Sequence, residues 1–166
     1  MNSTHLSAPA EIAADLRRRA DERQPSFSTA AIIATCFPKL TVTGHSTTTV
    51  PLGMLMRAMG HVIIYQRELP IPEQRVRIAH HLAHVIFDGH GRIAACTYAP
   101  DAEMRADQFA AELLVPLDEL KPFVWRLPPD ENTKDVIYWN QCDLIASRFA
   151  VPARLIDKRI RELRAS

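Results

Sequence analysis

Residues 74–84 read QRVRIAHHLAH. Apolar residues in and around this stretch recur at helical spacing and cover most faces, so we predict a buried helix over residues 72–87. His80 and His84 are four residues apart, which places both imidazoles on the same face of that helix. Buried imidazoles need polar partners, and a shared metal ion would satisfy both. A histidine pair without metal is the alternative, because this spacing alone is a weak signal.

Glu103 is the candidate for a third metal ligand. Residues 101–115 are predicted to form a second helix, whose core-facing stripe ends before Pro116. Glu103 lies three residues before Ala106 on that stripe, and a carboxylate that faces a core must be paired, hydrogen-bonded or bound to metal. The alternative is that Glu103 is only a first-turn acid favoured by the helix dipole.

The rest of the chain predicts further helices and a small sheet. Residues 9–22 and 28–37 are expected to be helical, and residues 40–66, rich in β-branched side chains, to form two or three strands of a small antiparallel sheet. Two further helices are predicted at the C-terminal end, joined by a turn between residues 149 and 152. We therefore expect a single α+β domain over residues 1–166, with N-terminal helices in 1–38, the sheet and both metal-site helices in 39–116, and C-terminal helices in 117–166.

The composition fits one globular domain with a sizeable core. Hydrophobic residues make up 47% of the chain and charged residues 23%, with 20 basic against 19 acidic side chains. This balance gives no overall reason to expect nucleic-acid binding. No apolar run is long enough for a membrane helix, so we expect a cytoplasmic protein. Cys36, Cys96 and Cys142 are odd in number and far apart, which favours reduced thiols over disulfides.

Three blocks of the sequence resemble the ImmA/IrrE metallopeptidases, a zincin-like family that acts with helix-turn-helix repressors in bacteria and their mobile elements. Residues 74–84 are similar to the family's RFTLAHELGH. Residues 103–116, EMRADQFAAELLVP, are similar to its E-x-x-A-x-x-F-A-x-x-L-L-x-P. Residues 144–160, LIASRFAVPARLIDKRI, resemble its C-terminal helix, turn and final helix, with Pro152 in place of the turn's serine. The resemblance covers roughly residues 40–164 in the family's order.

The resemblance implies that His80 and His84 are the first two zinc ligands and Glu103 the third, with water in the open position. The family's catalytic glutamate falls on His81, and its glycine two residues later is Ala83. A histidine can accept a proton, but a protonated imidazole would add a positive charge beside Zn²⁺, which should lower its basicity. Losing a positioned base typically costs about 10²- to 10⁴-fold in rate.

The implied function is a regulatory endopeptidase-like protein that binds zinc or another divalent transition metal and acts on a helix-turn-helix repressor. Catalysis is expected to be impaired or altered by His81. One alternative is an inactive pseudopeptidase that binds a partner or a small-molecule signal without cleaving it. Another is a different metal-dependent reaction in the same pocket.

Other polar side chains add no further assignment. His90 is interpreted as a turn residue, and the alternative is that it contacts a substrate or an oxyanion. Tyr65, Tyr98 and Tyr138 carry hydroxyl groups that can stabilise an oxyanion, but their spacing selects none of them.

The C-terminal helix is rich in cations, which invites comparison with a DNA-reading helix. Its apolar residues need a core to dock on, so we interpret the cations as a solvated face and do not expect direct nucleic-acid binding. These cations are Arg154, Lys158, Arg159, Arg161 and Arg164.

Overall fold

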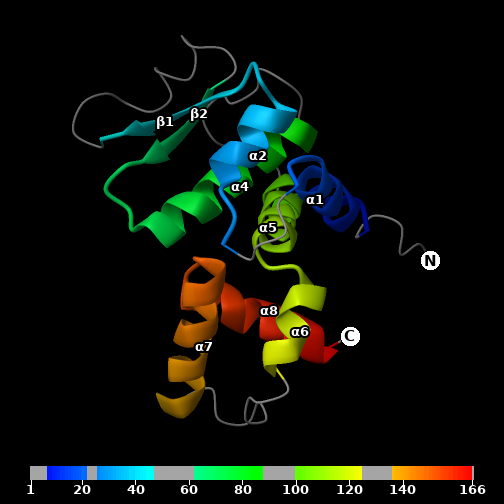
Figure 1. The fold of residues 1–166 in the computed structure, drawn as a ribbon, viewed down its shortest axis with the longest axis vertical. Helices are drawn as coiled ribbons and strands as arrows, with labels where there is room; N and C mark the ends of the chain where they lie inside the picture. Colours follow the sequence, from blue (N-terminus) through cyan, green and yellow to red (C-terminus); the bar gives the residue numbers. More distant parts are fainter. Residues whose placement is uncertain (1–6, 22–25, 47–61, 88–99, 125–135, 166) are drawn as a thin grey trace.

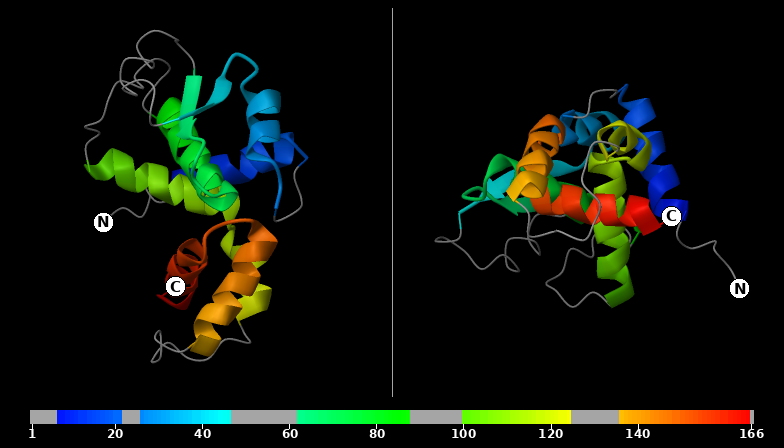
Figure 2. Two further views of the ribbon diagram at one scale, coloured as in Figure 1. Left: turned by 90° about the vertical axis from the view of Figure 1, so that its left-hand side faces the viewer. Right: turned by 90° about the horizontal axis from the view of Figure 1, so that it is seen from below.

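The structure is a computed structural model that describes residues 7–21, 26–46, 62–87, 100–124 and 136–165. In these ranges the chain forms helices α1 (Ser7–Arg19), α2 (Thr29–Cys36), α4 (Ile71–Phe87), α5 (Pro100–Leu114), α6 (Leu117–Val124), α7 (Val136–Phe149) and α8 (Ala153–Ala165), and strands β1 (Thr41–His45) and β2 (Val62–Gln66). Helices α1, α2, α4 and α5 gather with the strands in one group (Figure 1). Helices α6, α7 and α8 form a second group, and α5 leads from one to the other (Figure 2).

The sheet is parallel, so the predicted antiparallel arrangement is wrong. Thr41 pairs with Val62 and His45 with Gln66, which means that both strands run in the same direction. A parallel pair needs a crossover of about a dozen residues or more, and the segment between the two strands is longer than that. The first three residues of β2 are all buried, as is usual for parallel strands that are covered on both faces. A third predicted strand would lie in residues 47–61, outside the described residues.

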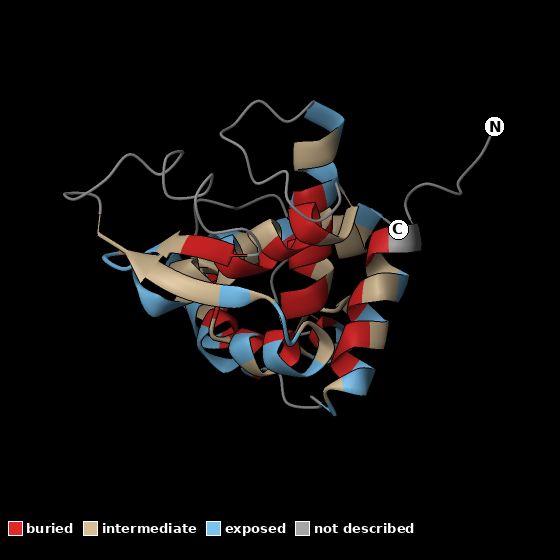
Figure 3. Cartoon of the chain, turned by 90° about the horizontal axis from the view of Figure 1, so that it is seen from above, coloured by how far each residue is buried: buried red, intermediate tan, exposed pale blue. Residues whose placement is uncertain are grey.

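The main core lies where α4 meets its neighbours. Helix α4 packs against both β2 and α5, and α1 packs against α5 as well. Buried residues gather on the inner faces of the helices and on β2, whereas exposed residues lie outside (Figure 3). The predicted burial of the histidine helix is confirmed for its second half, in which Ile78, Ala79, Leu82, Ala83, His84 and Val85 are buried.

Arg75 joins the second group of helices to the histidine helix. Its guanidinium donates hydrogen bonds to the carbonyls of Phe149 and Ala150 at 2.7 and 2.9 Å, and to the carbonyl of Phe27 at 2.7 Å. Ala150 adopts a left-handed φ of 50°, and the amide of Val151 closes the end of α7. The turn between α7 and α8 is therefore held against α4.

Arg159 of α8 makes a second connection, and the prediction that it belongs to a solvated face is wrong. Its side chain is only 2% exposed. The guanidinium donates to both carboxylate oxygens of Glu112 on α5, at 2.9 and 2.7 Å, and to the carbonyl of Val115 at 2.9 Å. Glu162 is a further partner. A planar, five-donor side chain can be buried here because carboxylates and a carbonyl surround it.

The helix bounds, the cysteines and the absence of a membrane helix among the described residues were also predicted from the sequence. Predicted helix bounds agree closely, but helix α6 after Pro116 was not individually predicted. Cys36 and Cys142 are free thiols. None of the described helices is long and apolar enough to span a membrane. His90, Cys96, Tyr98 and the predicted loop at residues 127–134 lie outside the described residues.

We expect Arg159→Ala to lower the free energy of unfolding by about 3 kcal/mol, because it leaves the largely buried Glu112 without its partner. The measurement is urea denaturation followed by circular dichroism. Arg154→Ala on the same helix is the control, because Arg154 is 70% exposed in its ion pair with Glu73. The control should change stability by less than about 1 kcal/mol. Equal losses in the two variants would contradict a structural role for the buried pair.

Candidate metal centre

Two neighbouring helices bring the three predicted ligands together. His80 and His84 lie one turn apart on α4, and Glu103 lies in the first turn of α5. The His84 side chain is only 4% exposed and that of His80 12%, whereas Glu103 is 47% exposed. Glu103 is therefore less buried than its place on an apolar stripe predicted, and its carboxylate lies where the histidines meet solvent.

The three side chains point their ligand atoms at one another. The Nε2 atoms of His80 and His84 are 3.0 Å apart. Glu103 places Oε2 3.2 Å from Nε2 of His80 and Oε1 3.5 Å from Nε2 of His84. Ligand atoms from all three residues lie within 4.8 Å of one another, and the group could hold a metal ion.

These separations are close to those between ligand atoms around a tetrahedral metal ion. Bonds of about 2.0–2.1 Å around a tetrahedral ion place its ligand atoms about 3.3–3.4 Å apart. The Nε2 atoms of the two histidines are 3.0 Å apart, and each histidine has a different oxygen of Glu103 near that value, Oε2 at 3.2 Å and Oε1 at 3.5 Å. Two nitrogens and a carboxylate are also the donor types of catalytic zinc sites, which keep a fourth position open. The arrangement suits a divalent transition metal.

Asp107 is a site residue that the sequence analysis missed. Its Oδ1 lies 2.8 Å from Nδ1 of His80. The hydrogen bond from His80 lowers the pKa of Asp107, and the positive charges of Lys158 and Arg77 act in the same direction. An ionised Asp107 holds the proton of His80 on Nδ1, which leaves the Nε2 lone pair facing Glu103. The available signal was spacing, because Asp107 lies four residues after Glu103 on the same helical face.

His81 is next to the ligands but differs from them in its surroundings. Burial lowers its pKa to about 4, and the charges of His80 and His84 add to that effect. A hydrogen bond to the backbone of Ile64 opposes the shift, whereas Nδ1 is buried without a hydrogen-bond partner among the described residues. His81 is therefore neutral near pH 7, and it is a weak base.

Two of the three candidate tyrosines fall within the described residues. The Tyr138 hydroxyl donates a 2.7 Å hydrogen bond to Asp157 of α8, and burial raises the pKa of this tyrosine. It is therefore part of the α7–α8 packing. Tyr65 lies on β2, where its ring packs close to Gly44 of the neighbouring strand. Neither contact involves the three clustered side chains.

The fold and the site together point to a class of protein, one in which two histidines from one helix and a glutamate from another could hold a metal ion, as in zincins. A family model described as the IrrE N-terminal-like domain, Peptidase_M78, matches residues 31–161. The chain therefore belongs to this metallopeptidase family, as the resemblance to ImmA/IrrE proteins predicted. Comparisons with curated proteins and with solved structures give no match.

We expect Asp107→Asn to weaken Zn²⁺ binding by about 10-fold, at the lower end of the range for carboxylates that orient a metal-bound histidine. The substitution keeps a hydrogen-bond acceptor but removes the charge. Competition with a chromogenic chelator measures the affinity. Asp101→Asn, which removes an exposed acid from the first turn of the same helix, is the control. The same affinity in both variants would contradict a role for Asp107 in orienting His80.

Proposed function

We propose that the chain is a cytoplasmic, regulatory metallopeptidase-like protein that acts on a helix-turn-helix repressor. In this proposal His80, His84 and Glu103 hold one zinc ion, and residues 1–166 act as a single domain. The carrying observation is that His80, His84 and Glu103 bring ligand atoms within 4.8 Å of one another, with the two Nε2 atoms 3.0 Å apart. Membership of the Peptidase_M78 family supports the peptidase-like class.

The residues around the site have separate roles in this proposal. A zinc ion, when bound, supplies a Lewis acid that polarises a peptide carbonyl and an attacking water. Asp107 fixes the orientation and tautomer of His80. Glu103 contributes one negative charge, and its partial exposure leaves the centre open to a polypeptide from the solvent side.

His81 is proposed to impair or alter the reaction. A glutamate at this position would accept a proton and lose a negative charge, whereas His81 gains a positive charge on protonation. The lowered pKa of His81 indicates that its surroundings already resist that charge. A bound dication would oppose the charge further. Slow cleavage, or cleavage that uses another base, follows from these electrostatics.

A pseudopeptidase is the second candidate, and the same environment of His81 favours it. The metal-ligand set does not depend on residue 81, so the protein could retain its metal and its partner without cutting it. Binding of the repressor would then carry the regulation. The two candidates differ only in whether a peptide bond breaks.

We expect protein purified without an affinity metal column to contain about one zinc per chain. His80→Ala should lose most of that metal, because two protein ligands bind zinc much more weakly than three. His45→Gln on β1 is the control and should keep the metal. Elemental analysis by mass spectrometry gives the ratio. Equal metal content in His80→Ala and His45→Gln would rule out the proposed centre.

We expect His81→Glu to raise the rate of repressor cleavage by about 10²- to 10⁴-fold, because it restores a carboxylate base beside the metal. The assay incubates the protein with Zn²⁺ and any helix-turn-helix protein encoded beside its gene, followed by intact mass measurement. His81→Gln is the control for a change of side chain without a base. Cleavage by the natural chain that is lost in His80→Ala supports the enzyme. An uncut complex that His81→Glu converts to cleavage supports the pseudopeptidase.

A further inference from the structure

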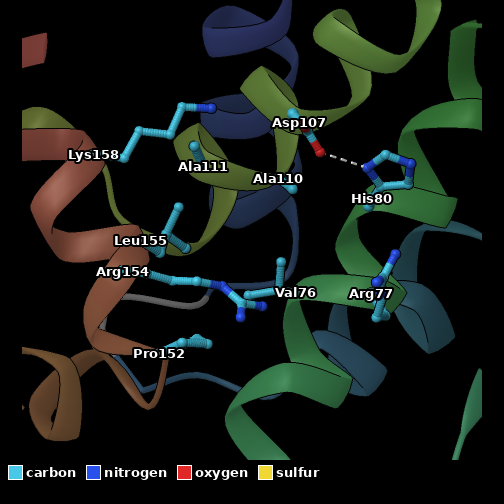
Figure 4. A pocket seen from close by; sticks show the side chains of 10 residues that line it. All are labelled: Val76, Arg77, His80, Asp107, Ala110, Ala111, Pro152, Arg154, Leu155 and Lys158. Carbon is cyan, nitrogen blue, oxygen red and sulfur yellow. Dashed lines mark hydrogen bonds and ion pairs between the residues drawn. The ribbon is translucent and has the colours of Figure 1, made fainter.

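An open pocket lies between the metal-site helices and α8. Its volume is about 290 Å³, and it is lined by residues of α4, α5 and α8 together with Pro152. This volume is at the lower limit of pockets that take small-molecule ligands, and it suits one amino-acid side chain. Figure 4 shows Arg154 and Lys158 extending from α8 on one side, with Arg77 on α4 across from them.

The pocket is continuous with the candidate metal centre along the seam between α4 and α5. His80 and Asp107 line the pocket, and they also belong to the metal centre or its support. On α4 the lining continues one turn before His80, with Val76. On α5 it continues one turn beyond Asp107, with Ala110. One helical turn is about 5.4 Å and an extended peptide advances about 3.3 Å per residue, so one or two residues of extended peptide would span from the candidate metal-ligand cluster into the pocket.

Positive charge dominates the lining. The lining contains one carboxylate, that of Asp107, and three cations, Arg77, Arg154 and Lys158. Arg154 is also paired with Glu73, which lies outside the lining. The two acids therefore balance two of the three cations, and one positive charge is uncompensated. Arg77 and Lys158 are exposed, and neither forms an ion pair or hydrogen bond with another described residue. Both are free to turn toward a bound anion.

The floor and remaining wall of the pocket are apolar. Val76, Ala110 and Leu155 contribute aliphatic surface, and Ala110 is almost fully buried. A glutamate side chain combines a short aliphatic stem with a terminal carboxylate, so it matches both the floor and the cations. A flat surface of lysines without such a floor would not select a side chain of this kind.

We propose that this pocket is a specificity subsite, which binds an acidic side chain of the polypeptide partner one or two residues from the position held at the metal. The inference rests on the proposed function, since it takes a polypeptide to be what the metal centre receives. It adds the chemical class of the recognised residue. Arg77 and Lys158 are the residues that make the selection.

The first experiment does not require a metal. The metal-free full chain, labelled with ¹⁵N, is titrated with N-acetyl-glutamate N-methylamide and, separately, with the matching glutamine compound. We expect shifts at the amides of Val76, Ala110 and Leu155, with about 5- to 10-fold tighter binding of the glutamate compound at low salt. Lys158→Met should bring the ratio close to one. Lys39→Met, which removes an exposed lysine outside the pocket, should leave it unchanged.

Two results of this titration would overturn the proposal. One is the absence of a preference for glutamate, whether or not either compound binds. The other is tighter binding of inorganic phosphate than of the glutamate compound, which would make the pocket a site for free anions. Loss of the preference in Lys39→Met as well would show that the preference comes from general charge, and this result too counts against the subsite.

The second experiment tests how many peptide residues separate the pocket from the proposed metal centre. Short peptide hydroxamates, which bind metal without needing catalysis, carry either glutamate or glutamine one or two residues from the hydroxamate. Their affinity is read from the visible spectrum of the Co²⁺-substituted chain. A glutamate preference at one of these positions supports the subsite, and a preference at neither overturns it. Failure of Co²⁺ to bind overturns the proposed metal centre, while the metal-free titration still decides whether the pocket selects an acid.

Discussion

The close approach of α4 and α5 is the constraint on which the site depends. The two helices pack together, and both carry buried alanines, among them Ala79 and Ala83 on α4 and Ala106 and Ala110 on α5. Small side chains allow two helices to pack at short interaxial distance. The packing of the two helices brings a glutamate on one within 3.2 and 3.5 Å of the imidazoles of the other.

In the proposed metal centre, His81 in place of the family's glutamate would change the charge of the site as well as its chemistry. A dication with Glu103 and a second carboxylate would be neutral, whereas with neutral His81 it keeps one positive charge. The pocket beside it adds a further uncompensated positive charge. In the proposed function, an anionic segment of a partner would therefore be held more strongly than in a neutral site, while proton transfer would be weakened. Both effects would favour binding over turnover.

The α6–α8 group contributes one wall of that pocket, and it is positioned by arginines. Arg75 binds carbonyls at the end of α7, and Arg159 binds Glu112 and the carbonyl of Val115. These contacts set the distance between α8 and the two metal-site helices. The positions of the α8 cations at the pocket therefore depend on Arg159 of the same helix and on Arg75 of α4.

Local pattern determined much of this protein. Helical periodicity and the i, i+4 spacing were enough to place His80 and His84 on one face, because those relations depend only on the geometry of a single helix. The sequence also offered Glu103 as the third member. Tertiary structure decided the parallel direction of β1 and β2, the role of Asp107 and the burial of Arg159. Each of these features depends on contacts between segments that are distant in the sequence. Strand direction, ion pairing and exposure arise from such contacts and cannot be read from one segment alone.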